Sequence, residues 1–283
     1  MTSTPLVLAW LVLAHLLADF VFQTESIALG KFGDGRPAWR ALAIHVAAVG
    51  LVNLPVVAVF GLPGAGFVVL TVGAHLVIDR AKIVLTKRGD PHPGSGSADA
   101  DGPALDRTWT PLPAALFILD QLAHLAVLVA AWQLLLAHAA PLGAWVDLVN
   151  WVLGGPYGDA FNHAALAVVV IADLAILNVR TGSLFVATLV RAPKSGVEAD
   201  AAGGGAASPA RIGATIGVLE RVIVATLVLA GAFDAIGLVI AAKTLARFKQ
   251  LDNREFAEYY LLGTLASISV AIITSLVARQ ALA

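Results

Sequence analysis

Long apolar runs dominate this sequence and limit the chain to one kind of fold. Eight segments are apolar for most of their length, at residues 5–23, 38–60, 64–85, 112–139, 161–179, 212–232, 235–246 and 257–278. A helix needs roughly 20 apolar residues to cross a hydrocarbon core about 30 Å thick, and backbone groups in lipid must be hydrogen-bonded within the protein. The sequence therefore predicts an all-α, polytopic transmembrane bundle of about eight helices. The seventh segment is near the lower length limit, which suits a tilted or re-entrant helix.

Composition excludes several classes of function. Hydrophobic residues make up 59% of the 283 residues and charged residues only 13%, against roughly 25% charged residues in soluble domains. A soluble enzyme and a disordered chain are therefore excluded. The formal net charge of −1 provides no basic field that would attract nucleic acid. The chain has no cysteine, which removes disulfides, thiolate metal ligands and cysteine nucleophiles.

The cationic residues predict the orientation of the chain in the membrane. All but two of the 18 Lys and Arg residues lie in or beside alternate links, namely those between segments one and two, three and four, five and six, and seven and eight. By the positive-inside rule these links are cytoplasmic and the N-terminus is outside. The first segment is not a convincing signal peptide, because no Lys or Arg precedes it.

Two small-residue, glycine-rich stretches, at 89–102 and 194–209, have the composition of flexible linkers. They lead to a predicted organisation in four parts. These parts are a four-helix membrane part at 1–140, a surface segment and fifth helix at 141–190, a cytoplasmic linker at 191–210, and a three-helix membrane part at 211–283.

Seven ionisable residues within four of the apolar segments form the candidate site, and we call them the His/Asp cluster. They are His15, Asp19, His45, His75, Asp79, Asp120 and His124. Three of the four segments carry a His and an Asp spaced i, i+4, which places both side chains on one helical face. The predicted directions of the segments put all seven residues in the cytoplasmic half of the membrane. Ionisable groups at that depth are costly and usually functional.

A short internal repeat also points to a common centre. AHLLAD at 14–19 is echoed by AHLVID at 74–79, on two segments that run in the same direction. A two-helix unit duplicated about an axis along the membrane normal would bring both His/Asp pairs together.

Imidazole and carboxylate groups together are ligands for zinc, iron or manganese. We expect all seven residues of the His/Asp cluster to be candidate metal ligands, with Asp19, Asp79 and Asp120 also acting as catalytic carboxylates or as groups that orient imidazoles. The leading hypothesis is a metal-dependent enzyme acting on a lipid-like substrate. The same residues could instead serve a divalent-cation or proton-coupled transporter, or fasten the helices of a non-catalytic scaffold. The outer half has no matching polar layer, which favours the enzyme over the transporter.

We expect membrane lipid to be a partner of this protein. Further polar residues are candidates for binding its anionic headgroup. They are Gln23, Lys82, Glu220, Arg221, Lys243 and Arg247. Lys82, like Lys31, can alternatively extend to the headgroup level by snorkelling. Glu220 and Arg221 are adjacent on one helix and need different partners: Lys243 or Arg247 for Glu220, and a carboxylate of the first bundle for Arg221. The alternative is an ion-pair network that only joins helices. The sequence carries no signal for the oligomeric state.

The stretches HLLADFVFQTESIALGK, HLVIDRAK and DQLAHL, with His45 between them, resemble a bacterial family of polytopic membrane proteins named domain of unknown function 3307. The later motifs IGVLER and AIGLVIAAK resemble the C-terminal half of its longer members. The resemblance implies an inner-membrane location and no particular activity, substrate or cofactor. It also implies that the family pattern includes the His/Asp cluster together with Gln23, Lys82, Glu220, Arg221, Lys243, Arg247 and Glu258.

Overall fold

The computed structural model describes residues 4–89, 112–156, 158–190 and 209–283, and within these ranges it contains helices and no strand. This confirms the all-α fold. The two predicted linkers lie outside the described residues except at their ends. The described chain divides into two compact units, and the main boundary between them falls between Ile176 and Leu177.

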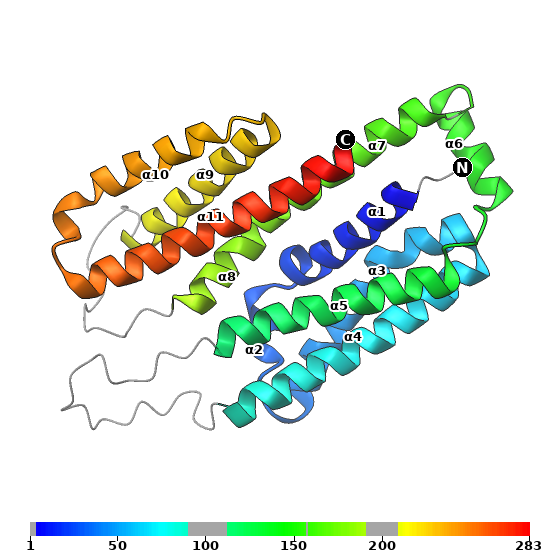
Figure 1. Cartoon of the computed structure of the whole chain (residues 1–283). Helices are drawn as coiled ribbons and strands as arrows, with labels where there is room; N and C mark the ends of the chain where they lie inside the picture. The colour runs from blue at the N-terminus through cyan, green and yellow to red at the C-terminus, as the bar shows by residue number, and fades with distance from the viewer. Residues whose placement is uncertain (1–3, 90–111, 157, 191–208) are drawn as a thin grey trace, which may run out of the picture. The chain divides into compact units, whose positions relative to one another are not determined.

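The first unit is built from helices that precede this boundary (Figure 1). They are α1 (Thr4–Leu16), the π-helical stretch η1 (Leu17–Phe22), α2 (Glu25–Gly30), α3 (Gly35–Phe60), α4 (Leu62–Gly89), α5 (Leu112–Leu135), α6 (Gly143–Leu153) and α7 (Asp159–Ile176). Helix α1 packs against α3 and α7, and α3 packs along α4.

The second unit contains the remaining elements. They are the π-helical stretch η3 (Leu177–Thr181), α8 (Gly182–Leu189), α9 (Pro209–Leu229), α10 (Asp234–Ala246), the 3₁₀ turn η4 (Phe248–Gln250) and α11 (Arg254–Leu282). Its apolar core contains Val224, Val228, Ile236 and Ala271.

Seven helical runs within the described residues are long and apolar enough to cross a membrane. One of them, Asp159–Leu189, joins α7, η3 and α8. The predicted segment 235–246 corresponds to α10, whose 13 residues span about 20 Å at 1.5 Å per residue. That length is well short of a hydrocarbon core and agrees with the short seventh segment of the prediction. The long helices also expose large apolar side chains such as Leu62, Val69 and Leu134, as expected of surfaces that face lipid.

Helices α3 and α4 reverse direction over a very short distance because of two glycines. Gly61 adopts a φ of 63°, which glycine tolerates without a steric penalty. At Gly64 a Cβ atom would collide with the backbone of Val56 and Val57, so only glycine allows the two helices to approach so closely.

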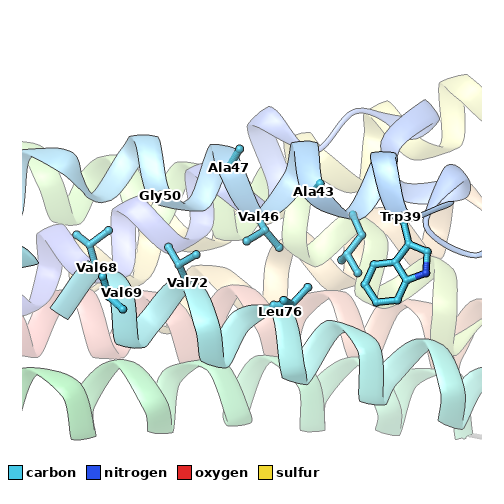
Figure 2. A pocket seen from close by; sticks show the side chains of 10 residues that line it. Trp39, Ala43, Val46, Ala47, Gly50, Val68, Val69, Val72 and Leu76 are labelled. Atoms are coloured by element: carbon cyan, nitrogen blue, oxygen red, sulfur yellow. The ribbon is translucent and has the colours of Figure 1, made fainter. Parts of the chain in front are cut away.

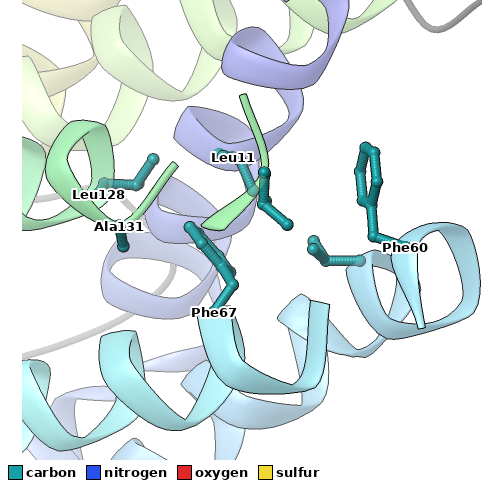
Figure 3. Close-up of a cluster of buried hydrophobic side chains, with 7 residues drawn as sticks. Leu11, Phe60, Phe67, Leu128 and Ala131 are labelled. Atoms are coloured by element: carbon teal, nitrogen blue, oxygen red, sulfur yellow. The ribbon is translucent and has the colours of Figure 1, made fainter. Parts of the chain in front are cut away.

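Apolar side chains fill the first unit at the end where α3 turns into α4. Figure 3 shows Leu11, Phe60, Phe67, Leu128 and Ala131 converging from α1, α3, α4 and α5. Val56 and Leu136 complete this buried set, which we call the apolar plug. Along the helices the plug begins about one turn from His15 and His124 and two turns from His75. The His/Asp cluster therefore has an apolar barrier on one side.

Candidate metal centre

The structure brings all seven residues of the His/Asp cluster together inside the first unit. His15 and Asp19 come from α1 and η1, His45 from α3, and the remaining four from α4 and α5. The side chains of the seven residues are between 1% and 12% exposed. Four ring contacts join the imidazoles, with centroids 4.2–6.1 Å apart. The prediction that four helices contribute to one polar site is confirmed.

Three ligand atoms form a small triangle at the middle of the cluster. The Nε2 atoms of His45 and His75 lie 2.9 Å apart. Among the described residues, the buried Asp19 Oδ1 makes no shorter polar contact than its 3.4 Å approach to each of these nitrogens. A carboxylate oxygen and two imidazole nitrogens therefore face one point.

Two further groups have the composition of a metal site. His15, Asp19 and His124 each place one ligand atom within 4.8 Å of the others, and so do His75, Asp79 and His124. Asp19 therefore belongs to two of the three candidate groups, because it also forms the triangle with His45 and His75.

Asp19 lies on a π-helical stretch, whereas its counterpart in the repeat does not. AHLLAD passes from α1 into η1 at Leu17, but AHLVID remains in the regular helix α4. Single π turns inside helices are frequent at functional sites. The local geometry thus differs between the two repeats, although the His and Asp positions correspond.

Two lysines neutralise two of the three carboxylates. Lys31 Nζ donates to Asp79 Oδ2 at 2.7 Å and to Gln23 Oε1 at 2.8 Å. Lys82 Nζ donates to Asp120 Oδ2 at 2.7 Å. Lys31 is only 6% exposed, so it belongs to the site and does not snorkel to the surface. Asp19 is the carboxylate of the cluster that forms no ion pair with lysine among the described residues.

Helix α5 fixes the orientation of His124. Its Nδ1 lies 2.8 Å from the backbone carbonyl oxygen of Asp120, which can only accept a hydrogen bond. Nδ1 therefore carries the proton, and the buried Nε2, which has no hydrogen-bond partner in the described part of the chain, presents its lone pair. Gln121, a residue that the sequence reasoning missed, places its Oε1 3.2 Å from His15 Nε2 and donates through Nε2 to Asp120 Oδ2.

An apolar groove of about 560 Å³ runs along α3 and α4, the helices that carry His45 and His75. In Figure 2, Val46 and Val72 point toward each other from the two helices. Trp39 lines one end of the groove, and the guanidinium carbon of Arg80 lies 4.5 Å from the centroid of its ring. The other lining residues of the groove are also apolar or glycine.

The remaining candidates for anion binding lie in the second unit. Lys243 Nζ donates to Glu220 Oε2, which confirms one of the two pairings predicted for Glu220. Arg247 instead donates to Gln250 in an exposed contact.

Arg221 is 3% exposed, and the predicted carboxylate partner is wrong for the described residues. Its guanidinium donates to the backbone oxygen of Asn178 and to the hydroxyls of Ser183 and Ser267. Gly182 packs against this guanidinium, and a Cβ there would lie 3.1 Å from Arg221 Nε. The neutral oxygens and the missing Cβ together accommodate the buried cation.

The long apolar helices and the buried cluster define a helical membrane protein with a polar, His- and Asp-rich site. The profile of the family described as Protein of unknown function (DUF3307) matches residues 7–153, more than half of the chain, and the chain belongs to this family. The matched region includes every residue of the His/Asp cluster. No curated protein and no solved structure gives a significant match.

Proposed function

We propose that this protein binds a divalent transition metal at the His/Asp cluster and acts as a metal-dependent enzyme on a lipid-like substrate. The observation that carries the proposal is the triangle of Asp19 Oδ1, His45 Nε2 and His75 Nε2, with edges of 3.4, 3.4 and 2.9 Å. Without a cation, this buried carboxylate oxygen has only the two 3.4 Å contacts with imidazole nitrogens among the described residues, and a poorly satisfied buried acceptor is energetically costly.

The triangle has the dimensions of a metal site. Oxygen and nitrogen ligands bind zinc at about 2.0–2.2 Å, so two ligands of one ion lie about 2.8–3.6 Å apart in octahedral or tetrahedral geometry. Asp19, His45 and His75 would hold one such ion through these three atoms. Its other side remains free for further ligands. Two imidazoles and one carboxylate on one face of an ion suit iron, manganese or zinc.

A metal with free positions supplies a Lewis acid or an activated water. Asp79 and Asp120, each bound to a lysine, would act as groups that orient the imidazoles or exchange protons with substrate. The apolar groove along α3 and α4 supports a lipid-like substrate, because an acyl chain can lie there beside the helices that carry His45 and His75.

Transport of a divalent cation is the rival use of the same residues. A transporter needs access to its site from both sides of the membrane, and at one end of the first unit the cluster borders on the seven buried apolar side chains of the apolar plug. A scaffold role is also disfavoured, because polar contacts in membranes contribute only about 0.6 kcal/mol on average. The first argument favours a site that is reached from one side, and the second favours a functional role over a purely structural one.

Metal analysis of the purified full-length protein tests the proposal. Protein from metal-replete medium should contain stoichiometric zinc, iron or manganese, and His45→Gln with His75→Gln should lose most of it. The matched control is His163→Gln, an exposed imidazole on α7, which should retain the metal. A wild-type protein that neither contains nor takes up metal would overturn the proposal. Metal uptake into proteoliposomes would favour the transporter.

A further inference from the structure

The geometry points to a dinuclear centre in which Asp19 bridges two metal ions. One ion would be held by Asp19, His45 and His75, and the second by Asp19, His15 and His124. This inference rests on the proposed function and goes beyond it, because a single ion would already satisfy the first triangle.

The two oxygens of Asp19 lie near different histidines. Oδ1 lies 3.4 Å from the Nε2 atoms of His45 and His75. Oδ2 lies 3.9 Å from His15 Nε2 on the other side. The rings of His15 and His124 are stacked with centroids 5.0 Å apart. His15, Asp19 and His124 each place one ligand atom within 4.8 Å of the others, so a carboxylate with its two oxygens near different imidazoles is suited to bridge two ions.

His124 provides an independent observation of the second site. It is 5% exposed, and the hydrogen bond from Nδ1 to the Asp120 carbonyl fixes the proton on that nitrogen. Histidine ligands of metals commonly donate their second ring nitrogen in this way, which orients the ring and selects the tautomer. The lone pair of Nε2 is therefore oriented but unused among the described residues.

Gln121 adds an oxygen at the same place. Its amide nitrogen donates to Asp120 Oδ2 at 3.1 Å, so its amide oxygen accepts a hydrogen bond from His15 Nε2 at 3.2 Å. An ion bound to His15 Nε2 would displace this proton and leave the amide oxygen facing the ion. An amide oxygen is a suitable additional ligand for a divalent ion. The second ion would then have two imidazoles, one carboxylate oxygen and one amide oxygen available to it.

Charge predicts that the two ions bind with different affinities. The three carboxylates of the cluster and the ammonium groups of Lys31 and Lys82 leave one net negative charge when the imidazoles are neutral. The first divalent ion reverses the sign of this charge, so the second binds against electrostatic repulsion. We expect the second ion to bind at least about tenfold more weakly.

Equilibrium dialysis of the metal-free full-length protein in detergent against Zn²⁺ tests the inference. Wild type and the control His163→Gln should bind two ions in two steps. The double variant His15→Gln/His124→Gln should lose the weaker step and keep the tighter one. Wild type that binds no zinc, iron or manganese would overturn the proposed function itself. Wild type that binds one ion, with no change in the double variant, would overturn only the dinuclear centre.

A spectroscopic measurement on wild type keeps the test independent of how well the variants fold. Protein loaded with excess Mn²⁺ and washed should show the exchange-coupled electron paramagnetic resonance signal of two adjacent ions. The six-line spectrum of isolated Mn²⁺ at every loading level would overturn the inference.

Discussion

Replacing Lys31 by methionine should strongly destabilise the metal-free protein. Lys31 Nζ lies 2.7 Å from Asp79 Oδ2, and the two side chains are 7% and 5% exposed. Methionine fills much of the space of the lysine stem but leaves the Asp79 carboxylate as a buried charge without its ammonium partner. Breaking a buried pair in this way costs about 3–5 kcal/mol. That cost is about a 150- to 5,000-fold change in the unfolding equilibrium, since 1.36 kcal/mol is a factor of ten.

The matched control is Lys87→Met. Lys87 Nζ lies 2.8 Å from Asp34 Oδ1, but these side chains are 37% and 96% exposed, and exposed ion pairs contribute little to stability. Each full-length variant is unfolded with SDS in mixed micelles, and the transition is followed by the fluorescence of the six tryptophans. Only Lys31→Met should shift the midpoint substantially.

The double variant Lys31→Met/Asp79→Asn separates the charge from the packing. It removes the uncompensated carboxylate, so the midpoint should return most of the way to wild type. Equal small shifts for the two single lysine variants would refute the reasoning. A double variant that is less stable than Lys31→Met alone would also refute the reasoning.

Three further predictions concern the helices and their placement in the membrane. Gly64→Ala should destabilise the protein by about 1–3 kcal/mol, because the added Cβ collides with the α3 backbone. The control Gly73→Ala has open space at that position and should be neutral or stabilising in the same denaturation assay. Arg221→Lys should lose about 1–3 kcal/mol, since one ammonium cannot reach the three oxygens that the guanidinium binds; an unchanged SDS midpoint would contradict this. In the cysteine-free chain, Ala232→Cys should react with a membrane-impermeant maleimide on intact cells and Lys249→Cys only after lysis, because the positive-inside rule places them on opposite sides. Labelling of both from the same side would show that α10 is re-entrant.

Much of the fold follows from local properties of the sequence. Apolar length alone identifies the seven long helices, because a backbone in lipid has few alternatives to a helix. The i, i+4 spacing of His75 and Asp79 places them on one helical face, and the same holds for Asp120 and His124. The convergence of these faces also follows, since charged groups in a membrane bundle turn away from lipid.

Other parts of the site depend on tertiary contacts that no spacing reveals. A lysine stem can snorkel to the surface or bury its ammonium beside a carboxylate, and the choice at Lys31 is made by its contact with Asp79. Gln121 is uncharged and therefore does not stand out among ionisable residues. Arg221 binds a main-chain carbonyl and two hydroxyls, and such partners are too common in sequences to be singled out. The change to a π-helix at Leu17 has no counterpart in the matching sequence of α4.

The apolar plug also bears on how far protons could pass along the imidazoles of the first unit. Four imidazoles in contact resemble a segment of a proton wire, and a wire dissipates an ion gradient only if it is continuous across the bilayer. Leu11 and Phe67, both fully buried, interrupt it about one turn beyond His15 and two turns beyond His75. Among the described residues, the contacts between imidazoles therefore stop short of the level of Leu11 and Phe67.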